Sequence, residues 1–263
     1  MTRFSYILLS VLVGGLASGG VVSSTSAADL TPQLDARHKA CLERIAVDQD
    51  IAYEEAMIWR DQGGGRRARH CEAMALFALG HESEAANRLD TLADSRDGGS
   101  KEMRLNFRAE AANFWLAAQD PDKAFESATA GLEYDAENAD LRIARARAYV
   151  MKGDLDQAET ELTRVLLHHP KSAEALRYRA DMRMRAGRLV AAKTDIEAAL
   201  NADLTSVETA LLRGHINEAI RLAEIEAALE NDGEDMGDPE TETETETETD
   251  TASPSAPDVQ ANE

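Results

Sequence analysis

The sequence predicts an all-α solenoid, in which helix–turn–helix units stack one after another. Three observations predict this fold class. Helix-favouring Ala, Leu, Glu and Arg are frequent, while aromatic residues make up only 5% of the chain. An order of small and apolar residues recurs at a fixed interval along the middle of the chain, and a turn signal marks each recurrence.

The N-terminal element, residues 1–28, has the pattern of a secretory signal peptide. Arg3 precedes an apolar stretch from Phe4 to about Ala17, and small residues follow around Ala27, where we expect cleavage. This stretch is short for a bilayer span, which needs roughly 20 residues. The sequence therefore predicts export across the inner membrane into the periplasm, or to the extracellular space if the source has no outer membrane. An anchor formed by an uncleaved N-terminal segment is the alternative, and the rest of the chain has no apolar run long enough to cross a bilayer.

The recurrence is clearest in the stretch "GDLDQAETELTRVLLHHP", which runs from Gly153 to Pro170. "AGRLVAAKTDIEAAL" repeats its order with the glycine at Gly187, a step of 34 residues. Glycine permits the positive φ of a tight turn between two helices, and small alanines let those helices approach closely. Pro170 is expected to end the second helix of its unit. The order therefore indicates packing between helices rather than a catalytic site.

Two earlier stretches carry the same order, one with Gly80 at the turn and one with Gln119 in place of the glycine. A small residue lies seven positions before each turn, and a bulkier one usually lies four positions before it. Arg183 takes the bulkier position in the last unit. The small and bulkier residues are Ala73 and Leu76, Ala112 and Trp115, Ala146 and Tyr149, and Ala180 and Arg183.

These residues resemble the tetratricopeptide repeat family, whose units form a right-handed α-solenoid. The resemblance covers residues 66–204 in four copies, with a spacer at 96–101. A degenerate helical repeat is expected at 29–65, where Ala52, Ala56 and Trp59 keep the spacing of a second helix. Residues 205–230 are expected to form a capping hairpin with its turn at Gly214, because a stack must cover its last apolar face.

The resemblance implies a non-enzymatic scaffold that binds a protein or peptide segment in a concave groove lined by the first helices of successive units. Some relatives hold a peptide's terminal carboxylate with Asn, Lys and Arg, a pattern that Asn113, Arg147 and Arg177 match only in part. Solvated helix faces, or a structural, self-associating accessory subunit of an envelope complex, are the alternatives. The groove residues implied by register are His70, Met74, Phe77, Asn106, Asn113, Leu116, Asp140, Ile143, Arg147, Met151, Arg177, Asp181, Met184 and Arg185.

A basic cluster, "GGGRRARH", places Arg66, Arg67 and Arg69 at the start of a predicted helix. Positive charge at that end opposes the helix dipole. Two explanations stay open. The arginines pair with acids of the preceding unit, such as Glu54 and Glu55, or they hold an anionic ligand or an acidic peptide end.

Cys41 and Cys71 are the two cysteines of the chain. In an oxidising compartment, two cysteines are most simply interpreted as one disulfide. They fall on the first helices of adjacent predicted units, which lie side by side. We therefore expect a bond that staples the degenerate first unit to the regular array.

No catalytic constellation is recognisable. The sequence lacks the HExxH zinc motif, the GxSxG nucleophile elbow and the GK[ST] ending of a phosphate loop. "HCE" at 70–72 has no PCxxC partner motif. Many carboxylates could form pairs, but they lie on helix faces at spacings suited to Arg partners, and such faces are solvated by default. We expect no enzyme activity, no metal and no cofactor.

The C-terminal element, residues 231–263, is strongly acidic. It holds 12 acidic residues and no Lys or Arg, and it includes "TETETETETD". Dense like charge without aromatic residues predicts a disordered, solvating tail, with weak Ca²⁺ capture or contact with a basic partner as alternatives. The formal net charge of the whole chain is −21, which excludes nucleic acid as a partner because its phosphates would be repelled.

Overall fold

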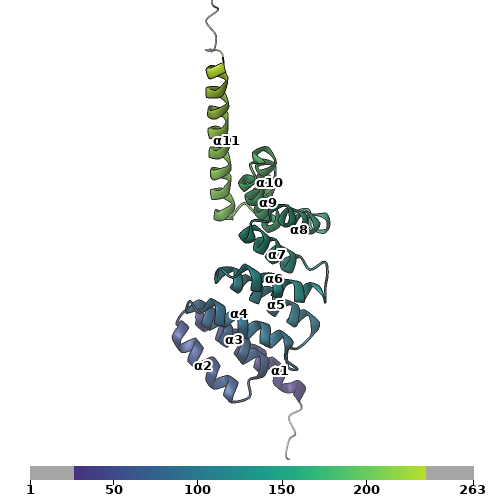
Figure 1. Ribbon diagram of the computed structural model, residues 1–263. Helices are drawn as coiled ribbons and strands as arrows, with labels where there is room; N and C mark the ends of the chain where they lie inside the picture. Colours follow the sequence, from purple (N-terminus) through teal and green to yellow (C-terminus); the bar gives the residue numbers. More distant parts are fainter. Residues whose placement is uncertain (1–26, 235–263) are drawn as a thin grey trace, which may run out of the picture.

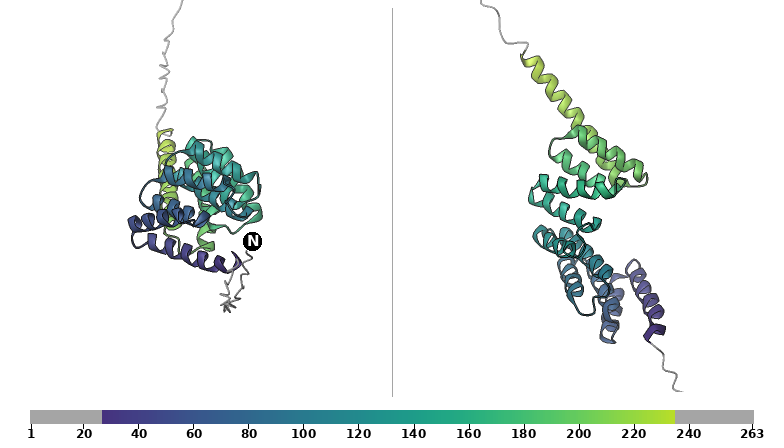
Figure 2. Two further views of the ribbon diagram at one scale, coloured as in Figure 1. Left: turned by 90° about the horizontal axis from the view of Figure 1, so that it is seen from below. Right: turned by 90° about the vertical axis from the view of Figure 1, so that its right-hand side faces the viewer.

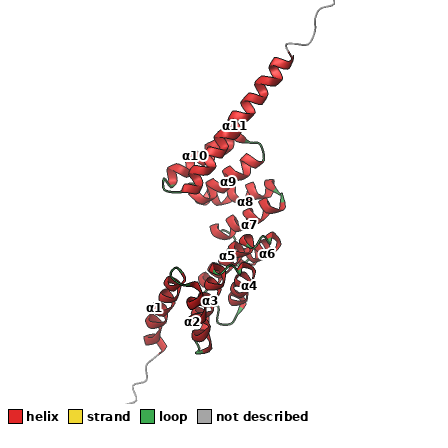
Figure 3. Cartoon of the chain, turned by 90° about the vertical axis from the view of Figure 1, so that its left-hand side faces the viewer, coloured by secondary structure: helices red, strands yellow, loops and turns green. Residues whose placement is uncertain are grey.

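The structure, a computed structural model, describes residues 27–234, and within them every regular element is a helix (Figure 3). Most of the predicted signal peptide and the acidic sequence beyond 234 lie outside the described residues. The helices are α1 (Ala27–Ile45), α2 (Gln49–Asp61), α3 (Gly65–Ala78), α4 (Glu82–Asp94), α5 (Lys101–Ala117), α6 (Pro121–Leu132), α7 (Ala139–Lys152), α8 (Leu155–His168), α9 (Ala173–Arg185), α10 (Leu189–Ala202) and α11 (Val207–Glu234).

The helices pack in chain order and build an elongated array (Figures 1 and 2). Each of α3–α10 contacts the next helix in sequence, and α5 also contacts α7, which in turn contacts α9. This arrangement confirms the predicted all-α solenoid of stacked hairpins. None of the helices within 27–234 is long and apolar enough to cross a bilayer.

Local sequence signals explain where the helices begin. Asp120 precedes α6 and its side chain accepts a hydrogen bond from the backbone N–H of Lys123, at 3.1 Å. Asn138 caps α7 in the same way through the N–H of Leu141. Such caps satisfy amide groups that have no partner inside the helix, and they fix the start of each unit.

The turns between paired helices lie where the recurrence predicts them. Gly153 ends α7 with φ of 83°, and Gly80 and Gly187 also have positive φ. At the corresponding turn, Gln119 has φ of 59° and is the one non-glycine residue with positive φ among the described residues. The turn geometry is therefore kept even where glycine is replaced.

Exchanging the residues at these turns tests this interpretation. Gln119→Gly is expected to raise the free energy of unfolding, and Gly153→Gln to lower it, by about 1 kcal/mol each, because left-handed backbone is costly for residues with a Cβ. No atom lies within 4 Å of a Cβ built on Gly153, so its effect comes from the backbone alone. Urea unfolding followed by circular dichroism measures both. Changes of the same sign in the two variants would contradict the interpretation.

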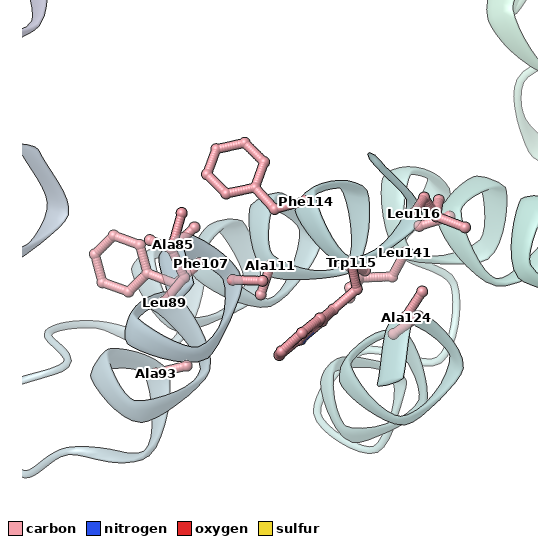
Figure 4. Close-up of a cluster of buried hydrophobic side chains, with 14 of the residues drawn as sticks. Ala85, Leu89, Ala93, Phe107, Ala111, Phe114, Trp115, Leu116, Ala124 and Leu141 are labelled. Carbon is pink, nitrogen blue, oxygen red and sulfur yellow. The ribbon is translucent and has the colours of Figure 1, made fainter. Parts of the chain in front are cut away.

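The core is built from the small and bulky residues of the recurrence. Ala73, Ala112, Ala146 and Ala180 are all fully buried. Figure 4 shows one cluster, in which residues of α4 such as Leu89 lie beside α5, and Trp115 lies toward α6. Close helix approach at alanines, with larger side chains beside them, confirms the packing role that the sequence predicts.

Buried ion pairs add a second layer of interactions that the sequence did not reveal. We expected the acidic residues on solvated faces, yet Glu161 and Asp195 are only 8% and 4% exposed. Each joins the second helix of a unit to two arginines of its first helix. The pairs join Glu161 of α8 to Arg142 and Arg145 of α7, and Asp195 of α10 to Arg179 and Arg183 of α9.

At the N-terminal end, a disulfide joins Cys41 of α1 to Cys71 of α3, with a Cα–Cα distance of 6.3 Å. Ala52, Ala56 and Trp59 of α2 are buried, as expected for a second helix. The first unit is thus a helical pair that is tied covalently to the next one.

The C-terminal end differs from the prediction. The expected hairpin at 205–230 is wrong, because α11 is one continuous helix in which Gly214 lies at an interior position. Residues on both sides of Gly214, such as Thr209 and Ile216, are buried where α11 packs on α10. Because both parts of α11 pack on α10, the helix continues through Gly214. Glycine permits a turn but does not require one. The helix also extends four residues into the segment 231–263 that was expected to be a disordered tail.

Candidate functional site

The first helices α3, α5, α7 and α9 carry the predicted groove residues, and we call their shared surface the first-helix face. A pocket of about 280 Å³ opens on it between α5, α7 and α9. Four predicted groove residues line the pocket, and Ala109, Glu110 and Glu174 complete it. The four are Asn106, Asn113, Asp140 and Ile143.

The walls of this pocket are mainly polar. Asn106 and Asn113 lie two turns apart on α5, while Asp140 and Glu174 lie in the first turns of α7 and α9. Carboxylates are favourable at helix N-termini because the dipole there is positive. Ile143, only 4% exposed, and Ala109 supply the apolar part of the lining.

Beside the pocket, two arginines of the predicted groove meet over one aromatic ring. The guanidinium carbons of Arg147 and Arg177 lie 5.0 and 4.2 Å from the ring centroid of Tyr178. Arg147 also donates a hydrogen bond to the side-chain oxygen of Asn113. The structure therefore brings Asn113, Arg147 and Arg177 together as the sequence suggested. It does so around Tyr178, which is not among the predicted groove residues.

Other predicted groove residues serve packing. His70 and Leu116 are buried, so their assignment as ligand-facing residues is corrected. Phe77 stacks on Phe114 with ring centroids 3.8 Å apart. Register alone places a residue on a helix face, but it does not show whether a neighbouring helix covers that position. The remaining residues are Met74 and Met184, which are partly buried against the core, the ion pair of Asp181 with Arg185, and Met151, which is 39% exposed.

His70 connects the pocket to the N-terminal unit. Its Nε2 lies 2.8 Å from Glu110 Oε2, and its Nδ1 lies 2.9 Å from Nε2 of His38 on α1. The pKa of His38 is lowered from 6.5 to about 4, mainly because burial disfavours the charged ring, and His70 and Arg67 lower it further. Asp35 and Glu110 oppose this shift. His38 therefore stays neutral while it packs against α3.

Acidification is expected to weaken the N-terminal unit. The pKa of His38 is lower in the folded state than in the unfolded state. The contribution of neutral His38 to the free energy of unfolding is therefore fully present above about pH 6.5 and is lost as the pH falls toward about 4. We expect the free energy of unfolding to fall by about 1 to 2 kcal/mol. This is less than the free energy that corresponds to the whole pKa shift, because solvent reaches the ring and screens its charge. Unfolding between about pH 7 and pH 5 measures it. His38→Asn should flatten this dependence, and His215→Asn at an exposed position should not; equal slopes in both variants would contradict the assignment.

The basic cluster at the start of α3 is paired inside the chain. Arg67 Nε donates to Asp35 at 2.6 Å, and both Arg66 and Arg69 form ion pairs with Asp97. Each of the three guanidinium groups thus has a carboxylate partner. Of the two explanations that the sequence left open, the structure shows pairing with acids of the chain. Asp35 lies on α1 of the preceding unit, as expected, whereas Asp97 lies in the spacer after α4. The example Glu55 pairs with Arg44 instead. Within 27–234, no group of three or more His, Cys, Asp or Glu side chains is arranged to hold a metal ion.

Comparison with known proteins agrees with this architecture. Residues 116–182 match the family model described as tetratricopeptide repeat. No curated protein matches the sequence. The solved structure of a tetratricopeptide repeat protein from Parabacteroides merdae is 18% identical with a TM-score of 0.57, covering 83% of this chain and 82% of that one. A thermophilic repeat protein from Thermus thermophilus is 17% identical with a TM-score of 0.56, covering 71% of this chain and 98% of that one.

A further solved structure is the first tetratricopeptide domain of Spaghetti bound to an HSP90 peptide. It is 23% identical with a TM-score of 0.42, covering 44% of this chain and 93% of that one. The family match is confined to residues 116–182, and the two larger structural likenesses agree with the α-solenoid fold of stacked helical pairs.

Proposed function

We propose that this protein is a non-enzymatic scaffold in the cell envelope that binds a segment of another protein along the first-helix face. The observation that carries the proposal is the pocket between α5, α7 and α9, because it gathers residues from three units on one surface. Tetratricopeptide repeats are generally non-catalytic scaffolds. The signal-peptide pattern and the Cys41–Cys71 disulfide, a bond that persists in oxidising compartments, support the envelope location.

Blocking the pocket tests this function without assuming the partner's chemistry. Asn106 is exposed and lines the pocket, so Asn106→Trp is expected to fill the space that the bound segment needs. Asn87→Trp on α4 is the matched control, since Asn87 is also exposed but lies on a second helix. Affinity capture from the envelope fraction should lose a partner by about tenfold with Asn106→Trp alone. Equal capture by both variants, with native circular dichroism spectra, would contradict the proposal.

One observation favours a second candidate function, a self-associating accessory subunit of an envelope complex. The later part of α11 extends beyond the array (Figure 1) and carries Leu222, Ile225 and Leu229, which are 53%, 44% and 67% exposed. Their spacing of three and four residues places them on one side of the helix. Light scattering distinguishes the two functions, because a mass that rises with concentration and falls after Ile225→Glu would support self-association.

A further inference from the structure

The pocket on the first-helix face holds three carboxylates that have no arginine or lysine partner among the described residues. Asp140 and Glu174 form no ion pair or side-chain hydrogen bond with any described residue, and Glu110 meets only the ring of His70. The buried carboxylates of the second helices, such as Glu161 and Asp195, do have arginine partners. The three carboxylates converge on one hollow from three different helices.

The chain has few means of neutralising this pocket by itself. In the parts whose side chains the structure does not describe, residues 1–30 contain one basic residue, Arg3, and residues 231–263 contain none. The latter segment adds 12 acidic residues, which raise the negative potential of the protein further. Arg147 and Arg177 lie beside the pocket but contact Asn113 and Tyr178, so we expect a cation that enters the pocket to come from another molecule.

The geometry points to an arginine-type side chain of the bound segment as the occupant of this pocket, an inference that rests on the proposed function. A guanidinium group offers five N–H donors in a planar fork, and the carboxylates of Asp140, Glu174 and Glu110 are acceptors that suit it. The apolar stem of such a side chain finds Ala109 and Ile143 in the same lining. The size of the pocket, its carboxylate acceptors and its apolar lining therefore all fit an arginine-type side chain.

The neighbouring residues define the orientation of that segment. The amide oxygen of Asn113 already accepts a hydrogen bond from Arg147, and Arg147 and Arg177 both lie over Tyr178. Positive charge thus flanks the acidic pocket on one side. A segment whose basic side chain enters the pocket, and whose acidic side chain lies beside Arg147 and Arg177, is complementary to both parts.

The test uses two small probes that differ in charge alone. N-acetyl-arginine methylamide carries the guanidinium, whereas N-acetyl-citrulline methylamide replaces it with a neutral urea of the same shape. Titration of the full disulfide-bonded chain is followed by the side-chain amide signals of Asn106 and Asn113 in NMR spectra. The arginine probe should shift both signals saturably, and the citrulline probe should bind about tenfold more weakly or not at all.

Two double variants localise the effect. Asp140→Asn with Glu174→Gln should abolish the preference for the arginine probe. Asp50→Asn with Asp156→Asn is the matched control, because these acids also lie exposed in first turns, on α2 and α8, and it should leave the preference unchanged. Equal binding of both probes, or an unchanged preference after the Asp140 and Glu174 substitutions, would overturn the inference.

The capture experiment separates this inference from the proposed function. If neither probe binds while Asn106→Trp still removes a captured partner, the inference is wrong and the proposed function stands. If Asn106→Trp leaves capture unchanged, the proposed function itself is wrong.

Discussion

Replacing Glu161 by alanine is expected to lower the free energy of unfolding by about 3 to 4 kcal/mol, because two arginines lose their shared carboxylate inside the array. Glu161 Oε2 lies 2.6 Å from Arg142 Nη1, and Oε1 lies 2.5 Å from Arg145 Nη2. Arg142 is only 5% exposed, so its guanidinium cannot simply turn into water. Arg142 keeps only a longer ion pair, 3.5 Å to Glu137, so the substitution leaves buried positive charge poorly compensated, which is costly.

Two further variants separate this cost from the loss of packing. Glu126→Ala removes an exposed glutamate from α6 and should change stability by less than about 0.5 kcal/mol. Replacing the triad together, as Arg142→Met, Arg145→Met and Glu161→Leu, should be less destabilising than Glu161→Ala alone, since no buried charge is left unpaired. Hydrogen exchange over α7 and α8 measures the local effect, which suits a repeat array. A cost for Glu161→Ala no larger than that of Glu126→Ala would contradict the assignment.

Removing the disulfide is expected to have the second largest effect, a loss of about 3 kcal/mol by the chain-entropy estimate. Cys41 and Cys71 are 30 residues apart, so the bond restricts a long loop in the unfolded chain. It also holds α1 to α3, where the apolar contact is small: Leu34, Leu42 and Ile45 are only partly buried against this cluster. Without the bond, α1 has little other apolar contact to keep it docked.

In hydrogen exchange, the amides of α1 and α2 should therefore be less protected in the Cys41→Ser/Cys71→Ser variant than in the native chain. The protection of α9 and α10 should be the same in both. Adding a reductant should weaken the amide protection of α1 and α2 in the native chain. It should not change the protection in the variant. Unchanged mass and thiol labelling before and after reduction would refute the disulfide itself. Equal protection of α1 and α2 in the oxidised native chain and the variant would refute its role as a staple.

The turns and the small-residue positions could be predicted from the sequence because they depend on local geometry. Gly153 and Gly187 mark a backbone conformation that few other residues adopt readily, and the buried alanines repeat at helical spacing. Gln119 was identified only by its place in the repeat, since its own residue type gives no turn signal.

Other features depend on which helices meet, and the sequence does not record this directly. An acidic residue such as Asp195 looks like a solvated surface group until a neighbouring helix covers it. Glu174 and Tyr178 were missed at the candidate site because first-turn acids and lone aromatic residues have ordinary structural roles. The single helix α11 was missed because Gly214 alone suggested a turn, whereas docking against α10 decides the outcome.

Photo-crosslinking in intact cells tests the central claim most directly, which is that the first-helix face binds a protein segment. A photoreactive phenylalanine derivative at position 106 lies at the pocket, and the same residue at position 87 lies on a second helix. We predict a covalent adduct from position 106 alone, mapped by mass spectrometry to one segment that contains an arginine or lysine. Adducts from position 87 alone, or from neither position while the protein is folded and present in the envelope, would contradict the account.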